Sequence, residues 1–201
     1  MKTKSIAELV QGVRFVDHKV KGVPAEFTLI GQGRSAAVFK LDGVRPAAVK
    51  VFYTEFRELA FKEASIYAKL ANHVYYPELI EAGEGYLVLE YLQGITFYDC
   101  LVSGVSITPV MVAMVDEALD YARKCGLNPS DTHLKNIILT PDHKIKVIDV
   151  VRFTQSEECP HWSDLKKAYY SYYQKRYFPK RFTPLFIEFI IRLYRKRLLP
   201  I

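Results

Sequence analysis

The chain has 201 residues, of which half are apolar and a quarter charged, and its net charge is +6. This composition excludes a disordered chain and predicts one substantial core, in one domain or in two small lobes. No stretch approaches the roughly 18 to 20 apolar residues of a membrane-spanning helix, and MKTKSIAELVQGVRF lacks the apolar run of a secretory signal. Three widely spaced cysteines are typical of reduced thiols, so we expect a cytoplasmic protein.

Short β-rich runs broken by turns dominate the chain as far as Leu92. They are EFTLIGQG, AAVFKLDG, PAAVKVFY and YLVLEYL, the last of which follows the turn-like EAGEG. One helical stretch interrupts them at about 54–72, with an apolar stripe that includes Phe61 and Ile66. A sheet-rich region is therefore expected over residues 1–92.

Helices are expected to dominate residues 93–201, which are joined to the first region at YLQG. A long helix is predicted from about Pro109 to Cys125, because the preceding threonine is a cap and the following glycine a stop signal. Two short strands follow, NIILT and KIKVIDV, separated by the turn PDHK. Two helical segments, divided by the prolines near 178–184, complete an α+β arrangement.

Positive charge gathers at the C-terminal end of the chain. Residues 164–201 hold ten basic residues and two acids, a net charge of +8, whereas the first 163 residues carry −2. Such a face attracts phosphate-bearing partners, although it is also what an ordinary solvated helix surface presents. The segment FTPLFIEFIIRLYRKRLLPI therefore either docks on an anionic membrane, RNA or protein partner, or packs its apolar face on the helical region.

Two features of the β-rich half suggest a phosphate site. In LIGQGRSAAVF, Gly31 and Gly33 lie at a strand end, where glycines let backbone N–H groups approach phosphate oxygens, although such a pair also makes a plain hairpin turn. Lys50 lies in the apolar run AVKVF, where a lysine is costly unless it meets an anion or reaches solvent from an edge strand. Glu63 on the predicted helix is its candidate partner, with Glu58 as the rival.

A third feature is PSDTHLKNIIL, followed by IKVIDVV. Asp131 stands between a helix and a strand, Asn136 opens that strand, and Asp149 closes the next one. Hard oxygen ligands such as Asn136 and Asp149 suit Mg²⁺, which needs few protein ligands when phosphates supply the others. Asp131 would then orient a hydroxyl, although each of the three residues could instead act as a cap or turn former.

Taken in order, these features resemble the protein kinase set: a Gly-rich turn, a strand lysine, a helix glutamate, D-x-x-x-x-N and a strand-end Asp. GQGRSAAV fits G-x-G-x-x-G-x-V except at Ala36, and AVK resembles V-A-I-K. The resemblance covers about residues 27–175. It implies a two-lobed protein kinase-like fold, with a sheet-rich N-lobe (1–92) and a reduced helical C-lobe (93–201) that together make one kinase domain.

The resemblance also implies ATP and Mg²⁺, or Mn²⁺, as cofactors. Lys50 would hold the α- and β-phosphates with Glu63 as its partner, Asp131 would be the catalytic-loop acid, and Asn136 and Asp149 would bind the metal. LVLEYL resembles a hinge with Leu89 as gatekeeper. The nucleotide-binding residues implied are Ile30, Gly31, Gln32, Gly33, Val38, Ala48, Lys50, Leu89 and the backbone of Glu90 and Leu92.

The sequence departs from the family pattern around Asp131. Pro129-Ser130 replaces His-Arg, and His133 stands where a lysine is common. If the acceptor hydroxyl and the γ-phosphate need a cation near Asp131, His133 or Lys135 must provide it.

A second departure follows the metal-binding strand. Valines come after Asp149 in place of Phe-Gly, and no A-P-E is present. Asp164, which resembles the acid that braces the catalytic loop, comes so soon that a long activation loop or a peptide-docking platform has no room.

Reduced forms of this kind resemble RIO-type kinases, the small kinase of the tRNA-modifying KEOPS assembly, lipopolysaccharide core kinases and, most of all, compact bacterial serine/threonine kinases. We therefore expect an enzyme that transfers the γ-phosphate of ATP to a hydroxyl of a protein. The alternatives are a small-molecule, sugar or lipid kinase, a nucleotide-binding pseudokinase, and an adaptor that works through its basic C-terminal helix.

Overall fold

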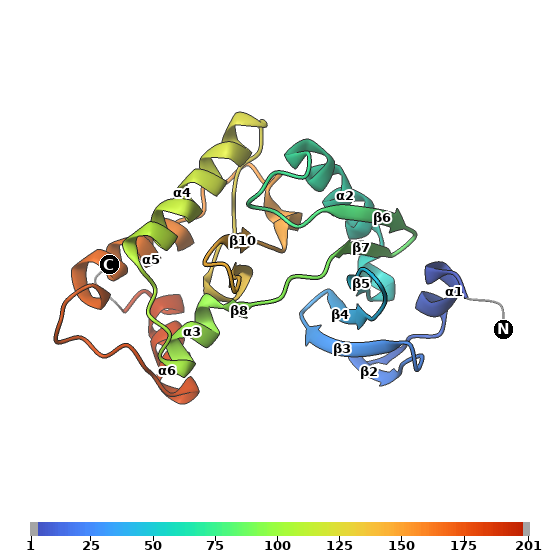
Figure 1. Cartoon of the computed structure of the whole chain (residues 1–201), viewed down its shortest axis with the longest axis horizontal. Coiled ribbons are helices and arrows are strands. Elements are labelled where there is room, and N and C mark those ends of the chain that lie inside the picture. The colour runs from blue at the N-terminus through green and yellow to red at the C-terminus, as the bar shows by residue number, and fades with distance from the viewer. Residues whose placement is uncertain (1–3, 199–201) are drawn as a thin grey trace. The chain divides into compact units, whose positions relative to one another are not determined.

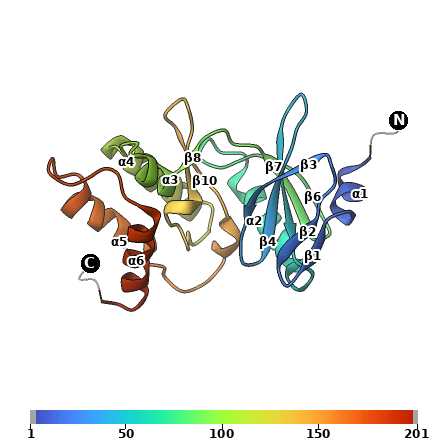
Figure 2. The same cartoon turned by 90° about the horizontal axis from the view of Figure 1, so that it is seen from below.

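The computed structural model describes residues 4–198 and divides into two compact units between Leu92 and Gln93 (Figures 1 and 2). The first unit is rich in strands, and most helices belong to the second. This distribution confirms the α+β expectation, with a sheet-rich first region and helices later in the chain.

A five-stranded antiparallel sheet forms the centre of the first unit (Figure 1), in the order β3-β4-β5-β7-β6. Its strands are β3 (Phe27–Gln32), β4 (Ala36–Leu41), β5 (Ala47–Phe52), β6 (Leu79–Gly83) and β7 (Tyr86–Glu90). Four of them lie within the four predicted β-rich runs. The fifth, β6, takes up the first three residues of EAGEG, so the turn there is shorter than the sequence suggested.

The middle strand, β5, is buried on both faces. It pairs with β4 and β7, and its side chains alternate between the two faces. Val49 and Val51 point into a core cluster that also contains Leu9 and Phe39, whereas Lys50 points to the opposite face. Burying each such aliphatic side chain contributes about 1.5–3 kcal/mol.

Two short elements at the start of the chain were not expected from the sequence. The helix α1 (Ile6–Gln11) begins with a capping box in which Ser5 and Glu8 each accept a hydrogen bond from the other's backbone N–H. The hairpin of β1 (Arg14–Val16) and β2 (Lys19–Gly22) follows. Apolar side chains of these elements pack against the core cluster, so they cover the sheet face that carries Val51.

The helix α2 (Glu58–Leu70) follows a 3-10 turn, η1 (Thr54–Phe56), and contacts β6 and β7. The buried residues of α2 are three or four positions apart, so they lie on one face of the helix. The buried side chains are those of Ala60, Glu63, Ile66, Tyr67 and Leu70. Phe61 is 58% exposed, so its place in the predicted apolar stripe was wrong.

A small antiparallel sheet lies in the second unit, in the order β10-β9-β8. Its strands are β8 (Ile95–Thr96), β9 (Ile137–Leu139) and β10 (Ile145–Val147), the last two of which confirm the predicted strand pair. Gly94 has a φ of +158°, and a Cβ there would collide with the carbonyl oxygen of Leu139. Only glycine therefore fits where β8 approaches β9.

The long helix and the two later helical segments predicted for the second unit are present, whereas its first helix was not expected from the sequence. The helices of this unit are α3 (Phe97–Ser103), α4 (Pro109–Lys124), α5 (His161–Ala168) with the π-helical turn η4 (Tyr169–Tyr173), and α6 (Pro184–Arg195). In α4, which contacts β10, Thr108 Oγ1 accepts a hydrogen bond from Met111 N, and Gly126 ends the helix region with a φ of +74°. Both boundary signals of this helix are confirmed. Within residues 4–198, no helix combines the length and the apolar character needed to cross a membrane.

Candidate functional site

A buried ion pair joins β5 to α2. Lys50 Nζ donates to both carboxylate oxygens of Glu63, at 3.0 and 2.7 Å. Glu63 is fully buried and Lys50 is 8% exposed, whereas Glu58 lies on the exposed side of the helix. The predicted pairing of Lys50 with Glu63 is therefore confirmed. Because a buried ion pair adds little net stability, its presence on this strand points to a role beyond the fold.

Five of the residues expected to bind the nucleotide lie on one face of the first sheet. Val38 lies opposite Gly31 on one side and Lys50 on the other, and Ala48 lies opposite Leu89. Directly opposed residues share a face, and so do positions two apart in a strand. All five residues therefore project from the face opposite the core cluster.

The remaining nucleotide candidates lie at the margins of this sheet. Ile30 is exposed at a bulge between β3 and β4. Gln32 Nε2 donates to a backbone carbonyl in the turn between β1 and β2, so this amide is committed to the fold. Glu90 N donates to Glu78 O at 2.9 Å, and Leu92 is the last residue of the first unit.

Gly31 lies near the end of β3, and Gly33 lies in the tight hairpin between β3 and β4. Gly33 N donates to Ala36 O at 2.8 Å, and Tyr53 donates through its backbone N to Ser35 O and through its hydroxyl to Gly33 O. Neither Gly31 nor Gly33 has a positive φ, and a Cβ on them would meet nothing closer than 3.8 and 3.7 Å. The fold itself does not require glycine at either position, so the missing Cβ atoms would allow a ligand to approach this backbone closely.

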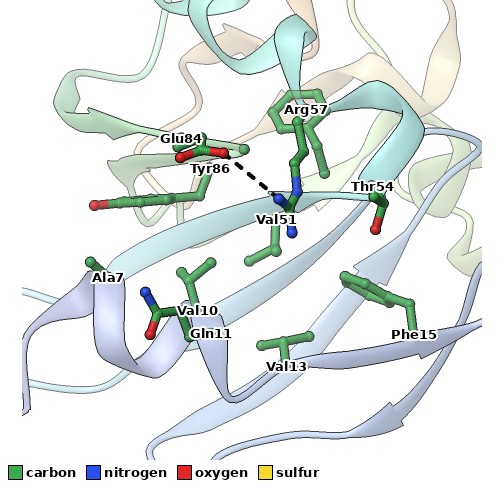
Figure 3. A pocket seen from close by; sticks show the side chains of 12 residues that line it. Ala7, Val10, Gln11, Val13, Phe15, Val51, Thr54, Arg57, Glu84 and Tyr86 are labelled. Atoms are coloured by element: carbon green, nitrogen blue, oxygen red, sulfur yellow. Dashed lines mark ion pairs between the residues drawn. The ribbon is translucent and has the colours of Figure 1, made fainter.

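A separate pocket of about 440 Å³ lies in the first unit (Figure 3). It is lined by Val10 of α1, Phe15 of β1 and Val51 of β5, and the Arg57–Glu84 ion pair, at 3.7 Å, crosses its rim. Val51 points to the face opposite that of its neighbour Lys50. This pocket is therefore not part of the candidate nucleotide face.

In the second unit, Asp131 lies in an irregular segment between α4 and β9. Its backbone is left-handed, with a φ of +60°, a conformation that Asp tolerates better than most residues. Its N–H donates to Cys159 Sγ at 3.3 Å, and its carbonyl accepts from Asn136 Nδ2 at 3.0 Å. Asn128 N, three residues earlier, donates to Phe153 O at 2.7 Å. The segment is thus held in place from both sides by residues distant in sequence.

Three basic side chains surround the Asp131 carboxylate. Arg152 Nε lies 3.4 Å from Oδ2, His161 Nδ1 lies 3.3 Å from Oδ1, and His133 Nε2 lies 4.0 Å from Oδ1. The His161 contact has the length of an ion pair without the alignment of a hydrogen bond. Burial lowers the pKa of His133, an effect that the charge of His161 reinforces and that Asp131 and Asp149 oppose.

Lys135, the other expected source of positive charge, lies elsewhere. Its Nζ sits over the ring of Tyr98, 4.5 Å from the ring centroid, which is a cation–π contact. In this arrangement Arg152 and the two histidines, rather than Lys135, face Asp131.

Asn136 and Asp149 carry the oxygens expected to bind a metal. Asn136 is buried at the end of the 3-10 turn η2 (Leu134–Asn136). Its Nδ2 donates to Asp131 O, and within residues 4–198 its Oδ1 accepts no hydrogen bond. Ile148 N donates to Asn136 O at 2.9 Å, which joins the two segments. Asp149 is exposed, with a φ of +58°, at the start of the 3-10 turn η3 (Val150–Arg152).

The oxygen atoms of Asn136 and Asp149 suit a hard cation whose other ligands are phosphate oxygens and water. Within residues 4–198, no group of three or more His, Cys, Asp or Glu side chains could hold a metal ion. An amide oxygen with no donor and a carboxylate at the end of the next strand are ligands that Mg²⁺ accepts, provided that phosphate oxygens and water complete its octahedron.

Asp164, expected to brace the loop of Asp131, has other partners among the described residues. Tyr194 OH donates to its Oδ2 at 2.8 Å, and Lys167 Nζ lies 3.7 Å from Oδ1. Burial and this hydrogen bond raise the pKa of Tyr194 to about 12. Asp164 thus ties α5 to α6, and the loop of Asp131 is held by other residues.

Sequence reasoning missed Arg152, Cys159 and His161, all of which contact Asp131 from the stretch that follows Asp149. In the sequence, this stretch is distinguished mainly by its shortness. The available signal was its own composition, because VRFTQSEECPH is too polar to be buried and ends in a cysteine and a histidine.

No protein-family model matches the chain. Among curated proteins it is similar to the "Putative serine/threonine-protein kinase YrzF" of Bacillus subtilis (strain 168), with 49% identity over 179 residues. The match covers 89% of this chain and 83% of that relative. At this identity and coverage, the chain belongs to the same kinase-like family. The kinase resemblance drawn from the motifs is confirmed at that level.

Proposed function

We propose that the chain is an ATP-dependent serine/threonine protein kinase, of the compact bacterial kind rather than the RIO, KEOPS or lipopolysaccharide kind. The carrying observation is the buried Lys50–Glu63 pair on the sheet face shared with Gly31, Val38 and Ala48. The similarity to a relative named as a kinase supports it. Residues 1–92 would be the N-lobe and residues 93–201 the C-lobe of one two-lobed kinase domain.

In this proposal the first unit binds ATP. Lys50, oriented by Glu63, donates to the α- and β-phosphate oxygens, while the hairpin at Gly31 and Gly33, which carries no Cβ at these two positions, lies along the phosphates. Val38, Ala48 and Leu89 supply an apolar surface for the adenine ring, with Ile30 and the backbone of Glu90 and Leu92 at its edge.

The second unit supplies the metal ligands and the acid. Mg²⁺, or Mn²⁺, bound by Asn136 and Asp149 would offset the phosphate charge. Asp131 accepts the proton of the acceptor hydroxyl as its oxygen bonds to the γ-phosphorus, and the bond from that phosphorus to the β–γ bridging oxygen breaks to release ADP. By the family pattern, His133 and Lys135 are the residues that would place a positive charge beside Asp131.

A small-molecule, sugar or lipid hydroxyl is the second candidate acceptor. The observation that favours it is the short connection from Asp149 to α5, which begins at His161. Residues 150–160 leave little chain for a peptide-docking segment. Label transfer to a small acceptor but to no protein would select this alternative.

The proposed function is tested with purified wild type and an Asp131→Asn variant, incubated with γ-labelled ATP, Mg²⁺ or Mn²⁺ and a generic protein acceptor. Asn is preferred to Ala because it tolerates the left-handed backbone at position 131. We expect label transfer by the wild type and its loss in the variant. Stabilisation of the wild type by ATP without any transfer would instead point to a pseudokinase or to an acceptor that the assay does not contain.

We also propose that α6 contacts an anionic membrane surface. Its inner face packs on the second unit through Ile187, whereas Leu185 and Phe189, one turn apart on its outer face, are 84% and 55% exposed. Arg192 follows on the same face. Within residues 4–198 no acidic side chain pairs with the basic residues at the end of this helix, which are Arg192, Arg195, Lys196 and Arg197. Apolar side chains beside unpaired positive charge complement anionic headgroups.

The cysteines support a proposal about the cellular compartment. Cys100, Cys125 and Cys159 are all unpaired, and burial raises the pKa of Cys100 to about 11, which keeps it a protonated thiol. Free thiols are typical of a reducing compartment, so we propose a cytoplasmic location.

A further inference from the structure

Asp131 lacks the lysine that the protein kinase pattern places two residues after the catalytic acid, because His133 occupies that position. Four basic side chains of the second unit could replace it: Lys135, Arg152, His133 and His161, whose Nδ1 lies 3.3 Å from Asp131 Oδ1. Lys135 points to Tyr98, and His133 stands 4.0 Å from the carboxylate with a pKa that burial lowers, so that it is the weaker cation. Arg152 is the nearest permanently charged group, with Nε 3.4 Å from Asp131 Oδ2.

The fold holds Arg152 in a defined place. It ends the turn η3, whose first residue, Val150, is fully buried, and the next residue, Phe153, is 1% exposed. Phe153 O also accepts the hydrogen bond from Asn128 N, which ties this turn to the segment that carries Asp131. The arginine therefore extends from an anchored turn toward an anchored acid.

The guanidinium has donors to spare. Arginine presents five N–H donors in a planar fork, and the approach to Asp131 is made by Nε, at 3.4 Å from Oδ2. The Arg152 side chain is 48% exposed, so its other nitrogens are open to a ligand. In addition, Arg152 lies three residues after Asp149, the candidate metal ligand, on the same turn.

We propose that Arg152 replaces the missing lysine: it holds Asp131 through Oδ2 and directs a second guanidinium nitrogen at the phosphoryl group in transit. Asp131 Oδ1, which His161 Nδ1 approaches to 3.3 Å, is then the oxygen that takes the proton of the acceptor hydroxyl. This inference rests on the proposed kinase function. Loss of one preorganised donor of this kind typically costs about 100- to 1,000-fold in turnover.

The test compares wild type with Arg152→Ala, Arg152→Lys and a control, Arg123→Ala, which removes an exposed arginine paired only with Asp120 on α4. We expect Arg152→Ala to lose about 100-fold in kcat with the KM for ATP changed less than about threefold. Arg152→Lys should retain part of the activity because it keeps the charge but not the fork. Arg123→Ala should match the wild type.

Two readouts separate a catalytic from a merely structural arginine. Low, non-denaturing concentrations of guanidinium ion should restore part of the activity of Arg152→Ala but none of that of Asp131→Asn. In thermal-shift titrations, the wild type should be stabilised more by Mg²⁺–ATP than by Mg²⁺–ADP, and Arg152→Ala should lose that preference even if no acceptor is known.

The outcomes distinguish this inference from the proposed function. If the wild type transfers label and Arg152→Ala equals it, only the role of Arg152 is wrong. A fall in activity that follows a fall in melting temperature, without guanidinium rescue, also overturns it. If the wild type neither transfers label nor gains stability from ATP, the kinase proposal is wrong and the Arg152 inference falls with it.

Discussion

Lys50 Nζ donates to both carboxylate oxygens of Glu63, and this pair is buried between β5 and α2. Removing one member of such a pair leaves the other as a buried charge, which typically costs 3–5 kcal/mol. The same residues that are proposed to serve ATP therefore also affect the stability of the first unit, and variants of this pair have to be read with both effects in mind.

The first prediction separates these two effects. Lys50→Ala should lower the free energy of unfolding by about 3–5 kcal/mol, whereas the double variant Lys50→Met/Glu63→Leu should recover most of it by replacing the charges with apolar volume. Neither variant should be stabilised by ATP in a thermal-shift titration. Urea titration measures the free energy of unfolding of each variant.

The control for this pair is Glu58→Gln, which alters an exposed acid on the same helix. This variant should have the same free energy of unfolding as the wild type and should bind ATP equally well. Stabilisation of the double variant by ATP equal to that of the wild type would remove Lys50 from the nucleotide site.

The pairing of Lys50 with Glu63 and the bounds of α4 were predictable because their signals are local. A lysine in an apolar run needs an anion, and a Thr-Pro start with a glycine stop delimits a helix. The elements α1 and β1–β2 were missed because each is only a few residues long and is stabilised by packing on Val51 and its neighbours. Arg152 and His161 were missed because their approach to Asp131 depends on how the chain after β10 folds back, which no local pattern encodes.

The second prediction concerns the metal ligands. Asp149→Asn removes a negative oxygen but keeps a residue that tolerates a φ of +58°. Turnover should fall by about 100-fold or more, with the Mg²⁺ concentration for half-maximal rate shifted upward, because metal-ion stabilisation contributes several kcal/mol. The exposed position predicts little change in melting temperature. An unchanged Mg²⁺ dependence would argue against Asp149 as a ligand.

The third prediction concerns pH. Burial lowers the pKa of His73, which follows α2, from its ordinary value near 6.5. The unfolded chain therefore takes up a proton at a higher pH than the folded chain. The contribution of neutral His73 to the free energy of unfolding is fully present at pH values above the ordinary pKa. This contribution is lost as the pH falls from the ordinary pKa toward the folded pKa, with a slope of at most about 1.4 kcal/mol per pH unit.

The measurement for His73 is urea unfolding at pH 7.5 and at pH 5.5. His73→Phe keeps a ring beside Tyr75, whose centroid lies 5.4 Å from that of His73, but removes the titrating group. The stability of this variant should fall less between the two pH values than that of the wild type. Equal losses in both proteins would show that His73 does not contribute.

The last prediction tests the outer face of α6. Wild type should pellet with anionic vesicles at low salt and be released at high salt, because headgroup attraction adds about 1 kcal/mol per basic residue and is screened. Leu185→Ser/Phe189→Ser should weaken binding about tenfold or more by removing inserted apolar area. The matched control, Phe61→Ser, removes an equally exposed aromatic from the first unit and should bind like the wild type. Equal binding to neutral vesicles, or none at low salt, would exclude an anionic membrane as the partner of this face.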